Sequence, residues 1–189
     1  MLFPLPELSA HVWISGFNGK PDDLDTTLRS MQGKFPDVTA QLVDLDRVPG
    51  SRYMLLATLN ALKSFHSKQP IAKTLGMEML LYIAADRQIS EAIRHVGITP
   101  ATERVAAILV GKVKDEVSDA ALLLAQILHQ KGDDKLVDDW SPDRTKNVLS
   151  IFRIGSKELK ATLRAKEEAK TEAIERLAVE RSALLTIRK

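Results

Sequence analysis

Basic side chains gather around the middle of the chain, in a pattern that can bind phosphate groups. Lysines lie in a predicted helix over residues 52–68 and before a predicted strand over 77–83, and arginines lie in the helix predicted after that strand. If the helices flank the strand, these charges meet on one rim beside a helix N-terminus, which favours anions. The alternative is that they lie on separate solvated faces. The candidate phosphate-binding residues are Lys63, Lys68, Lys73, Arg87 and Arg94.

Glu78 is the only charged residue within the apolar run 77–83. A buried carboxylate is costly unless it is paired. One interpretation pairs it with Lys73 or Arg87, so that it supports the basic site. The other places it at a sheet edge with its carboxylate in water. The sequence leaves both interpretations open.

No combination of residues predicts an enzyme active site. The segment 16–20 does not have the spacing of a phosphate-binding loop, and Pro21 stands where that motif has Ser or Thr. Asp44 and Asp46 could hold magnesium or transfer protons, but two acids at the end of a strand are expected to face solvent. No metal site is expected from the four separated histidines, which are His11, His66, His95 and His129. We therefore expect no catalysis, no cofactor and no small-molecule substrate.

Length and composition favour one domain over residues 1–189. The absence of cysteine excludes disulfides, thiolate catalysis and cysteine-bound zinc. The first ten residues do not resemble a signal peptide, and no apolar run approaches the roughly 18 residues of a membrane span. The expectation is a soluble cytoplasmic protein without a membrane partner. A net charge of only +2 does not by itself indicate nucleic-acid binding.

Hydrophobic periodicity predicts the mixed α/β (α+β) class, with an about four-stranded sheet covered by helices and an all-helical C-terminal third. The expected strands are 10–17, 38–48, 77–83 and 105–110. The expected helices are 21–33, 52–68, 87–96, 118–131, 142–152 and 156–185. In the helix 87–96, Asp86 is the expected cap and Gly97 the expected left-handed end. Its predicted apolar face comprises Ile89, Ala92, Ile93 and Val96.

Several short segments carry a resemblance to a known family. They are Lys73-Thr74-Leu75, Glu78, Gln88 to Ala92 (QISEA), Gly97-Ile98, and more weakly Ile151 to Glu158 and Val179 to Lys189. With them the chain resembles the PRPK-binding-protein family, the small accessory subunit of the KEOPS complex, over roughly residues 10–189. This complex installs threonylcarbamoyl on an adenosine next to the anticodon of certain tRNAs. The resemblance implies a non-catalytic subunit that binds the kinase-like ATPase of KEOPS and tRNA, including its unpaired 3′ end. It assigns the five basic residues to tRNA binding.

The C-terminal helical segment, residues 156–189, has a narrow apolar stripe that either docks on the body or faces a partner. The resemblance makes it a candidate kinase-binding surface, with Leu159, Leu163, Ile174 and Leu177 as contacts. Two other functions stay open: a stand-alone α/β enzyme with an unrecognised site, and a protein scaffold without RNA contact. Turnover by the isolated protein would favour the enzyme, and absent tRNA binding would favour the scaffold.

Overall fold

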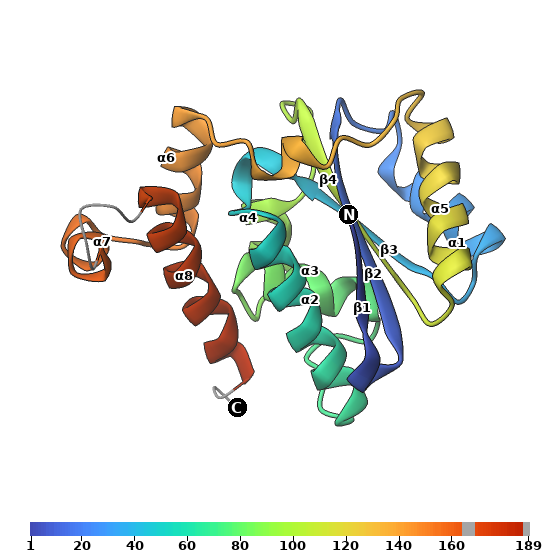
Figure 1. The fold of residues 1–189 in the computed structure, drawn as a ribbon, viewed down its shortest axis with the longest axis horizontal. Coiled ribbons are helices and arrows are strands. Elements are labelled where there is room, and N and C mark those ends of the chain that lie inside the picture. Colours follow the sequence, from blue (N-terminus) through green and yellow to red (C-terminus); the bar gives the residue numbers. More distant parts are fainter. Residues whose placement is uncertain (164–168, 187–189) are drawn as a thin grey trace.

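The structure is a computed structural model, and it describes residues 1–163 and 169–186. Within these ranges the chain forms a four-stranded antiparallel sheet and eight α-helices, which confirms the α+β class. The sheet lies in the middle, with helices on both of its faces and further helices on one side (Figure 1). None of the described helices has the length and apolar character needed to cross a membrane.

The sheet has the strand order β1-β2-β4-β3, so β4 lies inside it and β1 and β3 form its edges. The strands are β1 (Leu2–Leu5), β2 (Ala10–Asn18), β3 (Thr39–Asp44) and β4 (Arg104–Gly111). Because alternate residues of a strand point to opposite faces, β4 contributes to two cores. Val105, Ala107 and Leu109 belong to one core. Ala106, Ile108 and Val110 belong to the other.

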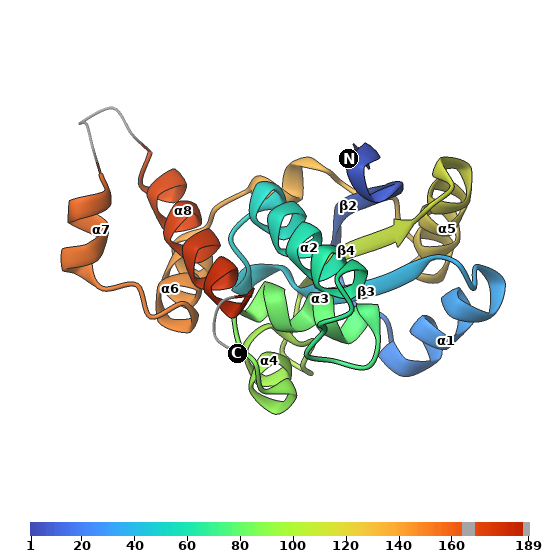
Figure 2. The ribbon, with the colours of Figure 1, turned by 90° about the horizontal axis from the view of Figure 1, so that it is seen from below.

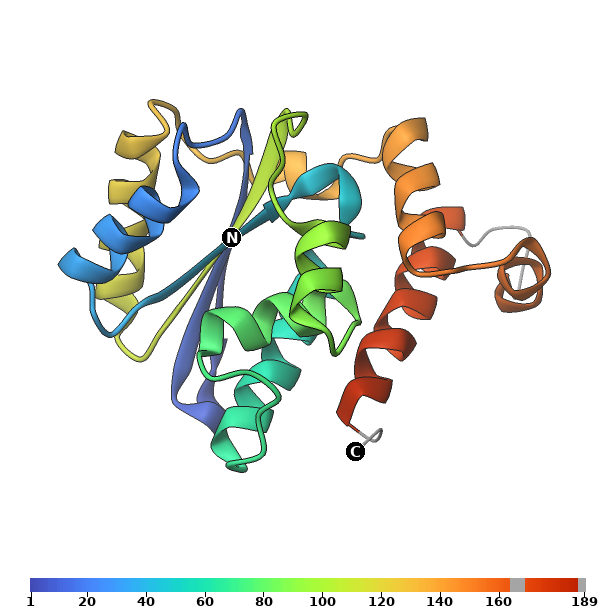
Figure 3. The ribbon, with the colours of Figure 1, turned by 180° about the vertical axis from the view of Figure 1, so that it is seen from behind.

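Helices cover each core. The first core is covered by α1 (Leu24–Lys34) and α5 (Lys114–Ile127). The second, larger core is covered by α2 (Ser51–His66) and α3 (Leu75–Ala84), followed by α4 (Ile89–Val96). The C-terminal helices α6 (Pro142–Ile151), α7 (Ser156–Thr162) and α8 (Lys170–Ala183) lie beyond this second layer (Figure 2). Seen from behind, α4 lies between the sheet and α8 (Figure 3).

The predicted strand over residues 77–83 is wrong, because this run lies within the helix α3. Thr74 caps the helix by accepting a hydrogen bond from the amide of Met77. The helix packs against α2, α4, α8 and β3, so that its residues from Glu78 to Ala84 are all buried. A helix that is apolar all round has no periodicity that separates it from a buried strand. The fourth strand is instead β1, which the hydrophobic pattern did not predict.

Three other expectations about helix ends are wrong. Asp86 is not the cap of α4, since Gln88 occupies that position and the Asp86 carboxylate accepts from its amide at 2.9 Å. Gly97 has φ −68° rather than a left-handed conformation, and Ala85 at the end of α3 is the left-handed residue, with φ 53°. The expected C-terminal helix 156–185 is two helices, α7 and α8, and residues 164–168 and 187–189 lie outside the described residues.

Polar contacts join the C-terminal helices to the start of α2. This helix begins after Gly50, which has no side chain to cap it. Asp138 accepts hydrogen bonds from the amide and the hydroxyl of Ser51, each at 2.8 Å. Glu175 of α8 accepts from the amide of Tyr53 at 3.1 Å. Carboxylates are stabilising at a helix N-terminus, so the cap of α2 comes from residues distant in sequence.

Candidate functional site

The turn between α3 and α4 is held in place from two neighbouring helices. The Tyr53 hydroxyl of α2 donates to the carbonyls of Tyr82 and Ile83, at 3.1 and 2.9 Å. The Ser182 hydroxyl of α8 donates to the carbonyl of Tyr82 at 2.9 Å. These bonds satisfy carbonyls that the end of α3 leaves without helical partners. Burial raises the pKa of Tyr53, so its hydroxyl stays protonated and donates.

The other end of α4 is fixed by Arg47. Its guanidinium donates to the carbonyl of Arg94 at 2.9 Å, where a cation complements the helix dipole. Asp44 lies 3.3 Å from the Arg47 guanidinium and accepts from the Thr102 hydroxyl at 2.7 Å. Burial raises the pKa of Asp44, against the opposing effect of these partners. Strand β3 therefore positions α4 through a short chain of side chains.

A cleft of about 400 Å³ lies where the α3–α4 turn meets the ends of α6 and α8. Its apolar lining includes Phe152 and Leu185. Its polar lining is rich in basic side chains and comprises Asp86, Arg87, Gln88, His95, Arg153 and Arg181. Three guanidinium groups against one carboxylate give the cleft a positive charge, which suits an anionic ligand. The apolar part can take the uncharged part of the same ligand.

The three arginines come from three different parts of the chain. Arg87 of the turn donates to the carbonyl of Leu185 at 3.0 Å. Arg181 of α8 forms an ion pair with Glu158 of α7. Arg153 is exposed and ends α6 in a left-handed conformation with φ 52°. Guanidinium groups present several donors in a plane, which matches the geometry of phosphate.

His95 of α4 lies at the wall of the same cleft, with its side chain 13% exposed. Its Nδ1 atom is buried without a hydrogen-bond partner among the described residues, and lies 4.0 Å from the Asp86 carboxylate. Burial, followed by the positive charge of Arg94, lowers the pKa of His95. The ring is therefore held in its neutral form at neutral pH.

The outer face of α4 carries two exposed isoleucines. Ile89 is 44% exposed and Ile93 is 48% exposed, whereas Ala92 and Val96 are buried. The apolar face predicted for this helix is therefore buried at Ala92 and Val96 and exposed at the isoleucines. They lie one helical turn apart and so form one apolar surface. The other large apolar side chains exposed among the described residues, Val113 and Leu122, lie at and in α5.

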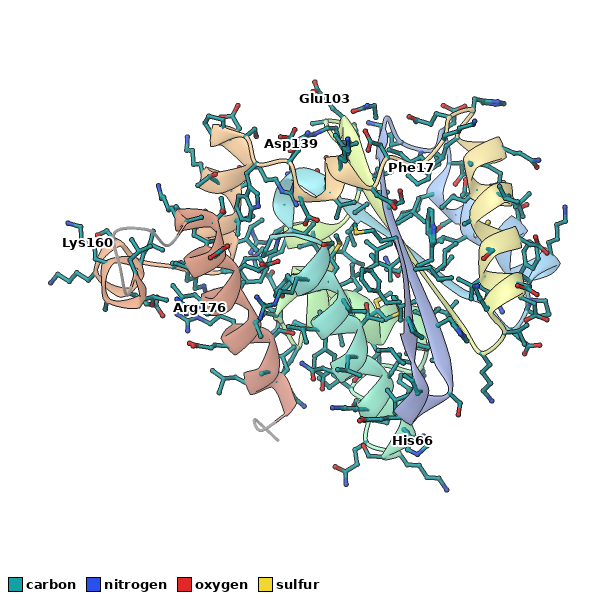
Figure 4. The ribbon with its side chains drawn as sticks, viewed as in Figure 1. Phe17, His66, Glu103, Asp139, Lys160 and Arg176 are labelled. Atoms are coloured by element: carbon teal, nitrogen blue, oxygen red, sulfur yellow. The ribbon has the colours of Figure 1, made fainter. Side chains whose placement is uncertain are left out.

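The structure divides the predicted phosphate-binding residues into two groups. Lys63, Lys68 and Lys73 are exposed at the end of α2 and in the loop before α3. This is the end of the molecule marked by His66 in Figure 4. Arg87 and Arg94 lie beyond the opposite end of α3, a helix of ten residues and hence about 15 Å in length. Only Arg87 lines the cleft, and Arg94 pairs with Glu91.

Both interpretations of Glu78 are wrong. Its side chain is fully buried in α3, and so neither faces water nor pairs with Lys73 or Arg87. The carboxylate accepts hydrogen bonds from the backbone amides of Ile71 and Ala72, at 2.9 and 2.6 Å. Glu78 thus fixes the loop that carries Lys73, and its partners are backbone groups that sequence reasoning did not consider.

The predicted kinase contacts of the C-terminal segment lie inside the protein. Leu159, Ile174 and Leu177 are buried, and Leu163 packs partly buried against the same core. These side chains therefore stabilise the packing of α7 and α8, and the structure does not support their use on a partner-facing surface.

Asp44 and Asp46 line a second hollow together with Arg47 and Arg104, with which they form ion pairs. Asp44 is buried, so the expectation that both acids face solvent is wrong for this residue. No group of possible metal ligands occurs among the described residues. Sequence reasoning grouped His95 with the basic residues near Arg87, but it missed Arg153 and Arg181, because these meet the α3–α4 turn only through tertiary packing. Arg153 does lie in the segment Ile151 to Glu158 that carried part of the resemblance.

Comparison with known protein families gives a match over most of the chain. The sequence model of the family described as kinase binding protein CGI-121 matches residues 22–186. The matched region includes the cleft, α4 and the C-terminal helices α6, α7 and α8, and leaves out β1 and β2. A search among curated proteins finds no match.

Proposed function

Because the chain belongs to the CGI-121 family of kinase-binding proteins, we propose that it is a non-catalytic subunit of the KEOPS complex. In this role it binds the kinase-like ATPase of the complex and tRNA, and acts in the cytoplasm during threonylcarbamoyladenosine modification. The single observation that carries the proposal is the family match over most of the chain. The structure adds two surfaces on and beside α4 that suit the two partners.

The kinase surface in this proposal is the outer face of α4. Exposed apolar side chains that form one surface mark interaction sites. Ile89 and Ile93 are about half exposed and adjacent, on a helix whose two ends are both held by the body. A rigid apolar surface binds without a large ordering cost. This surface replaces the buried stripe of α7 and α8 as the candidate kinase contact.

The tRNA surface in this proposal has two parts. The cleft beside α4 receives the unpaired 3′ end, with arginines to bind phosphate and apolar side chains to contact a base or ribose. The second part is the basic loop formed by Lys63, Lys68 and Lys73, which offers sequence-independent phosphate contacts. The basic loop and the cleft lie at opposite ends of α3, so one RNA molecule must span at least the length of this helix to reach both.

A binding experiment with purified components tests the proposal. The full chain is titrated by calorimetry with the kinase-like ATPase, with intact tRNA, and with tRNA trimmed of its unpaired 3′ end. We expect binding to the ATPase and to intact tRNA, and much weaker binding to trimmed tRNA. Kinase binding without tRNA binding would reduce the function to that of a scaffold. Threonylcarbamoyl transfer by the isolated chain would contradict the non-catalytic assignment.

A further inference from the structure

His95 is the one ionisable side chain of the cleft whose ordinary pKa lies near neutrality. Its ring is mostly buried, and the Nδ1 atom makes no hydrogen bond with any described residue. A buried polar atom without a partner is uncommon in native proteins. No hydrogen bond at Nδ1 therefore fixes the charge state of the His95 ring, and a ligand bound in the cleft can change it.

Charged groups approach His95 from each element around the cleft. On its own helix, Arg94 lies 2.9 Å from Nε2 and Glu91 lies 3.8 Å from it. The turn before α4 supplies Asp86 and Arg87, and α6 and α8 supply Arg153 and Arg181. Glu158 of α7 neutralises Arg181 through their ion pair. In the absence of a ligand, burial and then the charges of Arg94 and Arg153 oppose a positive charge on the ring and lower the pKa of His95, although Asp86 and Glu91 partly offset them.

We propose that His95 takes up a proton when a phosphate group enters the cleft, so that anion binding at this site is coupled to protonation. This inference rests on the function proposed above and concerns the cleft alone. An anion held in the cleft beside Arg153 offsets the repulsion between Arg153 and the imidazolium and itself attracts the imidazolium. The ring is then more basic in the bound state than in the free state.

Because anion binding and protonation of His95 are thermodynamically linked, the direction in which anion affinity changes with pH can be stated. Because the bound state holds the proton more tightly, affinity for the anion is greatest at low pH and falls as pH rises through the bound-state pKa of His95. A shift of one pKa unit between the free and bound states corresponds to a tenfold change in affinity. Phosphodiesters do not titrate between pH 5 and 8, so the change in this range reports on the protein.

Nuclear magnetic resonance of the full chain tests the coupling without RNA. The pH titration of the His95 ring is recorded in sodium sulfate and in sodium chloride of equal ionic strength. We expect sulfate to raise the pKa of His95 by about one unit. His66, exposed at the far end of α2, serves as an internal control and should not respond (Figure 4). The Arg153→Gln variant should reduce the shift at His95.

A second measurement uses a short RNA that carries the unpaired 3′ end. We expect it to bind wild type about tenfold more weakly at pH 8 than at pH 5.5, and His95→Gln with almost no pH dependence. RNA binding whose pH dependence is the same in wild type and His95→Gln, with no sulfate effect on His95, would overturn the inference and leave the proposed function intact. No RNA binding at any pH would reject RNA as the ligand, and the sulfate titration would then decide the coupling by itself.

Discussion

Arg144 is the largest charged side chain buried among the described residues. Its guanidinium donates to the carbonyls of Val48, Pro49, Val137 and Asp139, and lies 5.2 Å from the ring centre of Trp140. Burial lowers the pKa of Arg144 to about 10, so it remains charged at neutral pH. A single side chain thereby holds together the approach to α2, the segment before α6, and α6 itself.

Replacing Arg144 by Met should destabilise the protein by about 3–5 kcal/mol, because four buried carbonyls lose their donor. The measurement is the free energy of unfolding from chemical denaturation. Arg29→Met is the matched control, since Arg29 is 81% exposed and its contact with Asp25 is 4.0 Å long. This control should change stability by less than about 0.5 kcal/mol. Equal effects of the two substitutions would show that the buried contacts of Arg144 contribute nothing.

The stability of the folded protein should depend on pH through the titration of Glu175. Burial raises the pKa of Glu175 in the folded state, although the amide of Tyr53 partly opposes this. The folded state therefore holds the proton more tightly, and this contribution to stability is full below the unfolded pKa and is lost as pH rises through the folded pKa. Glu175→Gln keeps an oxygen to accept from Tyr53 but cannot titrate.

We expect the stability of wild type relative to Glu175→Gln to decrease as pH rises from about 4 to 7. Denaturation midpoints measured at several pH values provide the comparison. Glu172→Gln, at an exposed position of the same helix, reports the effect of removing a surface carboxylate. A relative stability of wild type that rises over this range would contradict the direction argued here.

At the scale of elements, α4 is the part of the fold most suited to a protein partner. Ile93→Glu should weaken binding to the kinase-like ATPase at least tenfold, because it places a charge in an apolar contact. The fold should tolerate the change, since the side chain is already half exposed. Leu122→Glu on α5 is the control, because Leu122 is 64% exposed and α5 covers the opposite face of the sheet.

Calorimetric titration with the ATPase distinguishes the two variants. Unchanged affinity of Ile93→Glu would remove α4 from the kinase surface. Weakening by Leu122→Glu alone would move the surface to α5.

The C-terminal helices contribute to the same body, and we propose that residues 1–189 fold as one domain. A chain ending at residue 155 loses the Glu175 cap of α2, the Ser182 bond to α3, and the buried Ile174 and Leu177. We expect this deletion to abolish cooperative thermal unfolding or to lower its midpoint by more than about 10 °C. An unchanged midpoint would show that the segment 156–189 is an independent appendage.

The sequence allowed three of the four strands and most of the helices to be predicted, because their apolar residues alternate or recur at helical spacing. It failed at α3, where burial on all sides removes the periodic signal. It also failed at β1, whose Pro4 is compatible with an edge strand but discourages the prediction of one. At the site, Arg87 was predicted from local context, whereas Arg153 and Arg181 depend on how the last third packs.

At the scale of the whole molecule, the two basic regions lie apart. The basic loop lies at the end of the molecule marked by His66 (Figure 4). The cleft lies beyond the other end of α3 from the basic loop. An RNA that neutralises both basic regions must therefore be long enough to span the distance between them.

Charge reversals in the two basic regions should have separable effects on tRNA binding. Lys73→Glu and Arg153→Glu should each weaken binding and lower the slope of log affinity against log salt, by roughly 0.7 for each single-strand phosphate that the variant no longer neutralises. Because the sites are far apart, the double variant should show the sum of the two free-energy changes. Lys34→Glu, at the end of α1 on the other side of the sheet, is the control.

Titrations at several salt concentrations give both quantities. Loss of affinity only for Arg153→Glu would restrict the RNA surface to the cleft, and loss only for Lys73→Glu would restrict it to the loop.

The capping of α2 by distant carboxylates also bears on how the protein is made. Tyr53 and Glu175 are separated by 122 positions, so α2 leaves the ribosome long before its cap exists. At synthesis rates of about 5–20 residues per second, this interval is roughly 6–24 s. During that time the amide of Tyr53 has only water as a partner, and the carbonyl of Tyr82 lacks Ser182. The helix that supports the cleft therefore reaches its final state only when nearly all of the chain has been translated.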